Sequence, residues 1–232
     1  MADYVAPDLI VDTAWLAEHL SDPNIRLVEM NQDPASFEDG HIPGAVLSPD
    51  WQIKSTNNKR LVASPSEAKA WLESAGISDD TLVIGYDRMK NRDASRLWWV
   101  LNYYGHTNVK VLNGGWIKWS TDGRPVEKGP AVASIGLATF TPKAANHDIE
   151  STTEKLRAAI HDRGAVIWDV RGRDEFTGEN ARGNARRGHV PGAVHLEWTE
   201  LNNDNHTFKS ADEIIAILRP LGITPDKTVH TY

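Results

Sequence analysis

The 232-residue sequence contains no cysteine. This absence excludes disulfides, thiolate metal sites and a cysteine nucleophile among these residues. No apolar run approaches the ~18 residues that a membrane helix needs. The N-terminus, MADYVAPD, also lacks the basic stretch followed by apolar residues that begins a secretory signal. We therefore expect a cytoplasmic protein with no membrane partner.

Positive charge is also scarce, since 25 Lys and Arg residues stand against 32 Asp and Glu residues and give a formal net charge of −7. A nucleic-acid-binding protein needs a basic footprint, so we expect no nucleic acid as a partner. An anionic substrate would require a local patch of cations. The nine histidines include no H-x-H or H-E-x-x-H pair, and no metal site is predicted.

The sequence is internally repeated. The motif GHIPGAV (residues 40–46) recurs 148 residues later as GHVPGAV (188–194). The stretch SPSEAKAWLESAGISDDTLVIGY (64–86) aligns without gaps with SADEIIAILRPLGITPDKTVHTY (210–232), 146 residues later, and nine of the 23 positions are identical. Two matched blocks in the same order predict two homologous domains, at residues 1–140 and 151–232, joined by a linker at 141–150.

Helical patterns alternate with short apolar runs in both copies. We expect helices at 13–20, 92–104 and 151–162, and strands at 25–30, 81–86, 109–112, 165–170 and 228–232. Ser64 with Glu67, Ser210 with Glu213 and Ser151 with Glu154 match the capping box at a helix N-terminus. The alternation predicts an α/β fold, in which each domain is a mostly parallel sheet flanked by helices.

Ligands of such sheets bind beyond the carboxyl ends of the strands. Tyr86 and Tyr232 end equivalent predicted strands. After Tyr86, a loop that starts at Asp87 leads into a helix, and this turn offers backbone N–H groups at a positive helix terminus. Asp87 can accept those hydrogen bonds but is a poor nucleophile. We expect Asp87 to act as a loop and N-cap residue.

These motifs, together with WDVRGRDEF (168–176) and VKVLNGGWIKW (109–119), give the sequence a specific resemblance. Over essentially the whole chain it resembles the tandem-domain rhodaneses, which are thiosulfate sulfurtransferases. The resemblance implies that the first domain is catalytically silent. It also implies that the second domain carries one cysteine directly after its strand TVHTY, at the position equivalent to Asp87. We therefore expect the nucleophile directly after Tyr232.

The second copy lacks counterparts of residues 87–123, which in the first copy supply a loop, a helix, a strand and a final helix. A domain without them would leave strand edges and apolar faces uncovered. We therefore expect the second domain to be incomplete as the sequence stands. Our hypothesis is that the sequence is interrupted at a chemically modified cysteine, with more chain following.

The resemblance also implies a reaction and its residues. The cysteine thiolate takes the outer sulfur of thiosulfate, sulfite leaves, and the persulfide passes its sulfur to cyanide or a thiol, with no metal or organic cofactor. Asp169 and Arg171 match a family pair beside the active loop, and we expect them to support that loop. Glu175 stands where some members carry a substrate-binding arginine.

Because of that departure, we expect the cationic patch to come from Arg182, Arg186 or Arg187. His41 and His189 open the repeated motif in the silent copy as well as in the other, which predicts a structural role for both. Two alternatives stay open. The donor could be 3-mercaptopyruvate, and a complete chain without cysteine would be a non-catalytic rhodanese-like binding module.

Overall fold

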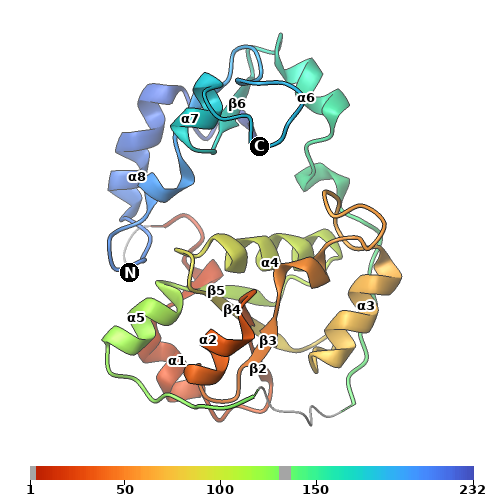
Figure 1. The fold of residues 1–232 in the computed structure, drawn as a ribbon, viewed down its shortest axis with the longest axis vertical. Helices are drawn as coiled ribbons and strands as arrows, with labels where there is room; N and C mark the ends of the chain where they lie inside the picture. Colours follow the sequence, from red (N-terminus) through yellow and green to blue (C-terminus); the bar gives the residue numbers. More distant parts are fainter. Residues whose placement is uncertain (1–3, 131–136) are drawn as a thin grey trace. The chain divides into compact units, whose positions relative to one another are not determined.

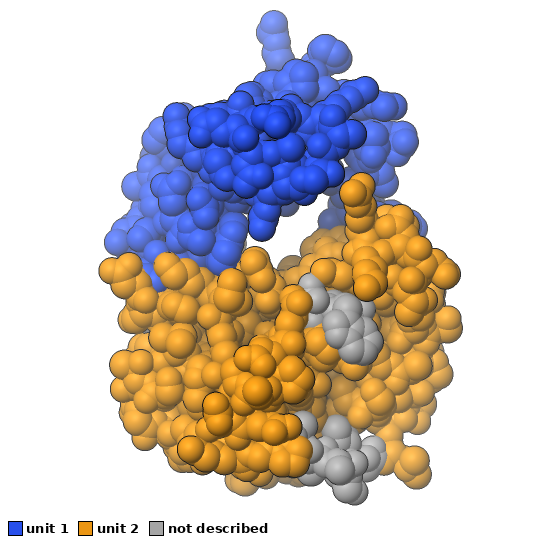
Figure 2. Space-filling view, viewed as in Figure 1, with its two compact units in different colours: residues 1–4, 147–203, 209–232 blue, residues 5–146, 204–208 orange. Residues whose placement is uncertain are grey.

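The computed structural model describes residues 4–130 and 137–232, leaving aside the side chains of residues 50 and 51. The chain forms two compact units, coloured separately in Figure 2. The N-terminal unit contains Val5–Asn146 together with Asp204–Phe208, and the C-terminal unit contains Tyr4, His147–Asn203 and Lys209–Tyr232. Each unit therefore includes a short segment from the other half of the sequence. Neither exchange is visible in the repeat pattern.

The N-terminal unit is built on a five-stranded sheet with the order β1-β5-β4-β2-β3, and all its strands are parallel (Figure 1). The strands are β1 (Ile10–Val11), β2 (Ile25–Met30), β3 (Val46–Ser48), β4 (Leu82–Asp87) and β5 (Val109–Leu112). β4 is central, and its last five residues are buried. The carboxyl end of β4 is therefore fixed by neighbours on both sides.

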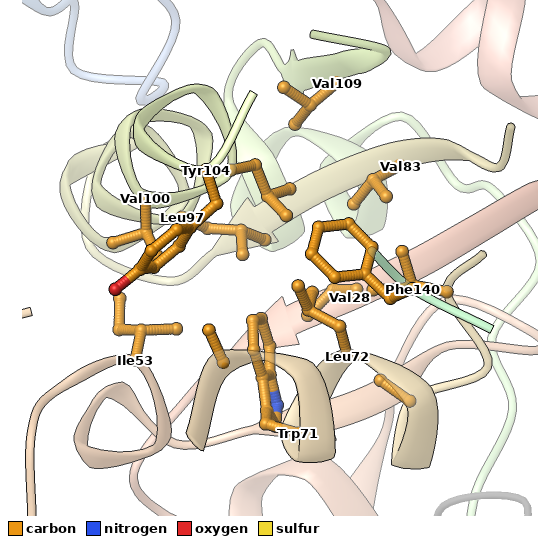
Figure 3. Close-up of a cluster of buried hydrophobic side chains, with 14 of the residues drawn as sticks. Val28, Ile53, Trp71, Leu72, Val83, Leu97, Val100, Tyr104, Val109 and Phe140 are labelled. Atoms are coloured by element: carbon orange, nitrogen blue, oxygen red, sulfur yellow. The ribbon is translucent and has the colours of Figure 1, made fainter. Parts of the chain in front are cut away.

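Helices cover both faces of this sheet. They are α1 (Thr13–His19), α2 (Pro34–Asp39), α3 (Pro65–Ser74), α4 (Arg92–Tyr103) and α5 (Gly115–Thr121), with short 3-10 turns η1 (Pro7–Leu9) and η2 (Asp50–Ile53). One hydrophobic cluster joins Val28 and Val83 of the sheet to Trp71 and Leu72 of α3 and to residues of α4 (Figure 3). A second cluster packs α1, α2 and α5 against the opposite face. Successive strand residues point to opposite clusters, as the pleat requires.

The local signals at helix ends explain most boundaries. Two of the three predicted capping boxes, at Ser64 with Glu67 and at Ser210 with Glu213, are formed. The third predicted cap, at Ser151, was wrong by one residue, and the helix predicted at 151–162 is shorter at both ends. α6 (Thr153–Ala159) is capped by Thr152, whose hydroxyl accepts the N–H of Lys155 at 3.3 Å. Two adjacent hydroxyl residues compete for this position, and the second of them satisfies the first turn.

The C-terminal unit has a three-stranded parallel sheet with the order β7-β6-β8. Its strands are β6 (Ala165–Asp169), β7 (Val194–His195) and β8 (Thr228–Thr231), and its helices are α6, α7 (Arg173–Thr177), α8 (Ala211–Leu218) and the turns η3 (His147–Ile149), η4 (Trp198–Leu201) and η5 (Arg219–Leu221). The order corresponds to β3-β2-β4 of the N-terminal unit. The predicted α/β class with parallel, helix-flanked sheets is confirmed.

The chain after the N-terminal sheet is held against that unit. Phe140 is 1% exposed and belongs to the cluster in Figure 3. Its N–H donates to Glu73 at 3.0 Å, and its carbonyl accepts from Lys69 at 2.7 Å. The last residue of the predicted first domain thus packs as part of the N-terminal core. None of the helices in the described part of the chain combines the length and apolar composition that crossing a membrane requires.

Candidate functional site

The loop after β4 is built around the buried carboxylate of Asp87, which is 1% exposed. One carboxylate oxygen accepts the backbone N–H groups of Met89 and Asn91, at 2.8 and 2.9 Å. The other accepts those of Asp93 and Ala94, also at 2.8 and 2.9 Å. Four convergent N–H groups form a socket for an anion, and in this unit the side chain of Asp87 fills the socket itself.

Two residues of this loop have the backbone conformation that such a socket requires. Lys90 and Asn91 have φ angles of 54° and 68°, in the left-handed region, which turns N–H groups toward a common centre. Burial raises the pKa of Asp87, while the N–H groups of Ala94 and Met89 oppose the rise. The predicted N-cap assignment needs correction, because Asn91 is the N-cap of α4. Asp87 reaches the first turn of α4 from the strand end instead.

Asp169 and Arg171 form an ion pair at the carboxyl end of β6. Asp169 is fully buried, and one of its oxygens accepts the backbone N–H and the Nε–H of Arg171, at 3.0 and 2.9 Å. Its other oxygen lies 2.5 Å from a terminal guanidinium nitrogen. The same nitrogen donates to the carbonyl of Gly188 at 3.0 Å. The structure brings these two predicted residues together in a bidentate geometry that fixes both side chains.

Tyr232 completes this cluster. The guanidinium carbon of Arg171 lies 5.2 Å from the centre of the Tyr232 ring, and the phenol oxygen accepts the N–H of Val190 at 2.9 Å. Burial alone would raise the pKa of Asp169, but hydrogen bonds from Arg171 and Tyr232 outweigh it and lower that pKa. Burial and the neighbouring Asp169 raise the pKa of Tyr232. The cluster therefore holds a charged carboxylate beside a neutral phenol at neutral pH.

The N-terminal unit contains a matching cluster that the sequence analysis missed. Glu29 is paired in register with Tyr86 and is fully buried. It accepts the Nε–H of Arg88 at 2.7 Å, and Arg88 also donates to the carbonyl of Gly40 at 2.6 Å. The hydroxyl of Tyr86 accepts the N–H of Ile42 at 3.2 Å. The available signal was one acidic residue inside the apolar run IRLVEM.

The three arginines predicted as an anion patch differ in their surroundings. Arg182 pairs with Glu175 at 3.1 Å, and Glu175 also lies 3.6 Å from Arg171. Glu175 is 7% exposed, so this carboxylate is buried between two guanidinium groups. Arg186 and Arg187 are exposed. Of the three, these two are the better placed to meet an anion from solvent.

His41 and His189 make the same contacts in the two units. The Nδ1 atom of His41 lies 2.9 Å from the carbonyl oxygen of Phe37, and that of His189 lies 2.8 Å from the carbonyl oxygen of Phe176. Each imidazole stacks on the ring of the same phenylalanine, with centroids 3.8 and 3.7 Å apart. The histidines anchor the repeated turn, in agreement with the predicted structural role.

Comparison with known proteins gives a consistent family. The model of the rhodanese-like domain matches residues 12–122 and 152–232. The chain is 34% identical, over 99% of its length and 83% of its relative, to the sulfur carrier protein TtuD of Thermus thermophilus. It is 32% identical to a Haloferax volcanii protein provisionally named thiosulfate sulfurtransferase, over 100% of the chain and 83% of that protein.

The fold has a close counterpart among solved structures. SseA from Escherichia coli, described with the rhodanese fold and mechanism of 3-mercaptopyruvate sulfotransferases, superimposes with a TM-score of 0.83 at 28% identity. The match covers 96% of this chain and 87% of SseA. Since the family model matches both halves and the relatives align along nearly the whole sequence, the chain belongs to the tandem rhodanese-like domain family.

Proposed function

We propose that the protein is a sulfurtransferase that moves the outer sulfur of thiosulfate to a thiophilic acceptor such as cyanide or a thiol. The observation that carries the proposal is the cluster of Asp169, Arg171 and Tyr232 at the carboxyl ends of β6 and β8. The proposal requires a cysteine directly after Tyr232, at the position equivalent to Asp87. A thiolate there would stand beside a fixed guanidinium group.

The socket around Asp87 supports the chemistry. Four N–H groups converge on a side chain at this loop position in the N-terminal unit. An equivalent loop around a cysteine would direct the same donors at its sulfur. Backbone N–H groups and a helix N-terminus lower a thiol pKa, so the nucleophilic thiolate would be populated at neutral pH.

The reaction balances without an oxidant or a reductant. The thiolate attacks the outer sulfur of thiosulfate, a new S–S bond forms, and sulfite leaves with the electron pair of the broken S–S bond. Cyanide then attacks the outer sulfur of the persulfide, which gives thiocyanate and restores the thiolate. Two half-reactions on one nucleophile predict ping-pong kinetics.

The roles of the charged residues follow from their positions. Asp169 and Arg171, which hold each other and the carbonyl of Gly188, would support the loop rather than react. Arg187 and Arg186, on an exposed segment, would contact the dianionic donor. Arg182 is the weaker candidate because Glu175 already neutralises it.

A second sulfur donor, 3-mercaptopyruvate, is the alternative to thiosulfate. The likeness to SseA, described among the 3-mercaptopyruvate sulfotransferases, supports 3-mercaptopyruvate as the alternative. The deciding experiment is a sulfur-transfer assay of the full-length protein with cyanide, offering thiosulfate or 3-mercaptopyruvate in turn. We expect thiocyanate from thiosulfate, and none after serine replaces the cysteine that follows Tyr232. A protein inactive with both donors would contradict the proposal and favour a rhodanese-like binding module.

The cationic patch has its own test within the same assay. We expect Arg187→Ala to raise the KM for thiosulfate about ten-fold, because one contact to a charged group is worth roughly 1.5 kcal/mol. Arg182→Ala is the matched control, since its guanidinium group is already paired. An unchanged KM in Arg187→Ala and in Arg186→Ala would remove both residues from the donor site.

A further inference from the structure

A short polar segment from the second half of the sequence belongs to the N-terminal unit. Residues 204–208, called the strap below, follow η4 and precede α8, yet they cluster with the N-terminal unit (Figure 2). The strap has the sequence DNHTF and is attached at both ends to the C-terminal unit. With one apolar residue among five, the strap gains little from hydrophobic burial, and hydrogen bonds hold it to the N-terminal unit.

Asn91, in the loop between β4 and α4 that is called the silent loop below, binds the centre of the strap. Its Nδ2 group donates to the carbonyl of His206 at 2.8 Å. The Oδ1 atom of Asn91 accepts the N–H of Gly114 at 3.2 Å, and its backbone N–H donates to Asp87. Asn91 is 1% exposed. One buried residue therefore ties together the socket, through its backbone, and the strap and the turn between β5 and α5, through its side-chain amide.

The end of the strap is held by that same turn. The N–H of Phe208 donates to Oδ1 of Asn113 at 2.8 Å. Gly114 has a φ of 89°, and a Cβ atom there would lie 2.4 Å from Cβ of Lys118 and 3.1 Å from the methyl group of Thr207, so both the turn and the strap leave no room for a side chain. The Phe208 ring forms a wall of a mainly apolar cavity of about 160 Å³, together with Leu9, Ile10, Ser95, Trp98 and Val111.

The strap also makes hydrogen bonds within itself. Oδ1 of Asn205 accepts the N–H and the hydroxyl of Thr207, at 3.2 and 2.7 Å, which forms a local turn. His206 has a φ angle of 68°, a conformation that is unfavourable for a residue other than glycine. Contacts with Asn91 and Asn113 offset this strain. The strap is thus held as a peptide ligand is held, and Asn91 and Asn113 are the residues that bind it.

We propose that the silent loop has become an intramolecular receptor for the strap, and that docking restrains the arm that runs from η4 through α8 to β8. The strap lies within this arm, and β8 ends at Tyr232 in the proposed active site. The loop that could hold a nucleophile in the N-terminal unit instead holds a segment of its own chain. The kinetic part of this inference rests on the proposed function, whereas the docking itself does not.

The test compares Asn113→Ala with Asn102→Ala in the full-length protein. Asn113 is the acceptor for the N–H of Phe208, while the side chain of Asn102 donates to the carbonyl of Trp98 within α4, at 2.9 Å. Hydrogen exchange of the peptide containing residues 204–208 and steady-state sulfur transfer are measured for both. In Asn113→Ala we expect exchange to rise about five- to ten-fold, the usual effect of one lost hydrogen bond.

We also expect kcat of Asn113→Ala to fall about three- to ten-fold with the donor KM changed less than about two-fold, because a loosened arm misplaces reacting groups without removing a donor contact. Phe208→Ala should behave in the same way, and Phe208→Leu should recover most of the rate. Equal exchange in Asn113→Ala and Asn102→Ala would overturn the docking. Faster exchange with an unchanged kcat would overturn the restraint on the arm. A wild-type protein without transfer activity would instead refute the proposed function, and exchange would still decide the docking.

Discussion

The two units build the same link at the end of the sheet with arginines from different chain positions. In the N-terminal unit, Arg88 follows Asp87 in the loop and joins Glu29 to the carbonyl of Gly40. In the C-terminal unit, Arg171 comes from the chain just after β6 and joins Asp169 to the carbonyl of Gly188. Gly40 and Gly188 are the first residues of the repeated motif.

The difference shows what the link demands of the loop. In the N-terminal unit the loop after β4 supplies the guanidinium group, so Arg88, which follows Asp87, has a structural role. In the C-terminal unit, the segment between β6 and α7 supplies it, so the link does not draw on the strand end at Tyr232. The two units therefore differ in which strand end carries the guanidinium group.

The largest expected effect comes from removing either arginine. Arg88→Ala and Arg171→Ala each leave a fully buried carboxylate without its partner, which costs about 3–5 kcal/mol of unfolding free energy. Urea unfolding measures both. Only Arg171→Ala should also reduce sulfur transfer in the folded fraction. Arg182, whose side chain is 67% exposed, is the control and should lose less than about 1 kcal/mol. A loss below 1 kcal/mol in Arg171→Ala would show that the pair is not required.

The paired tyrosines give a smaller and unequal effect. Tyr86→Phe removes the acceptor for the N–H of Ile42 in a fully buried site, and should cost about 1–3 kcal/mol. Tyr232→Phe should cost less, because Tyr232 and Val190 are only half-buried and water can replace the hydroxyl. Thermal or urea unfolding ranks the two variants. The reverse order would mean that the clusters are not equivalent in packing.

Docking of the strap on the N-terminal unit should depend on pH. Burial lowers the pKa of His206, Lys90 lowers it further, and Asp87 opposes both. A lowered pKa in the docked state means that docking is fully favourable above the ordinary histidine pKa of about 6.5 and weakens as the pH falls below it. Exchange of the strap, corrected for intrinsic rates, should rise several-fold between about pH 7.5 and pH 5. His206→Gln should abolish the dependence, and a dependence that persists in this variant would assign it to another group.

The smallest expected effect is a stabilisation. His206→Gly should raise the unfolding free energy by up to about 1 kcal/mol, because glycine adopts a φ of 68° without strain and the backbone carbonyl that Asn91 binds is kept. The melting temperature of the full-length protein measures this change. Thr207→Ser, in the same strap, is the control for unrelated loosening. A lower melting temperature in His206→Gly would mean that the imidazole itself contributes to docking.

The repeat made much of the site predictable. Because strands and turns recur at a nearly constant offset, the equivalence of Tyr86 and Tyr232 and the position of Asp87 at a strand end follow from letters alone. The pair of Asp169 and Arg171 lies two residues apart, within reach of pattern reasoning. The donor, the cysteine after Tyr232, the domain boundaries and the cytoplasmic location stay predictions.

The missed features share a physical cause. The contact of Glu29 with Arg88 depends on the register of β2 against β4, which is set by the whole sheet and not by either segment. The strap docks through backbone groups of His206 and Phe208, and backbone groups leave no mark in the sequence. The surplus of asparagines in LNNDNHTF was the one available sign.

The exchange of segments has a consequence for how the chain is made. Tyr4 belongs to the C-terminal unit, where its hydroxyl donates to the carbonyl of Lys209, and the strap belongs to the N-terminal unit. A ribosome that adds about 5–20 residues each second releases the strap several seconds after Asn146. Until then, the receptor loop around Asn91 is without its ligand. During translation, the N-terminal unit is therefore completed in two stages. A chaperone that binds the nascent chain between them would meet the loop around Asn91 before the strap has docked on it.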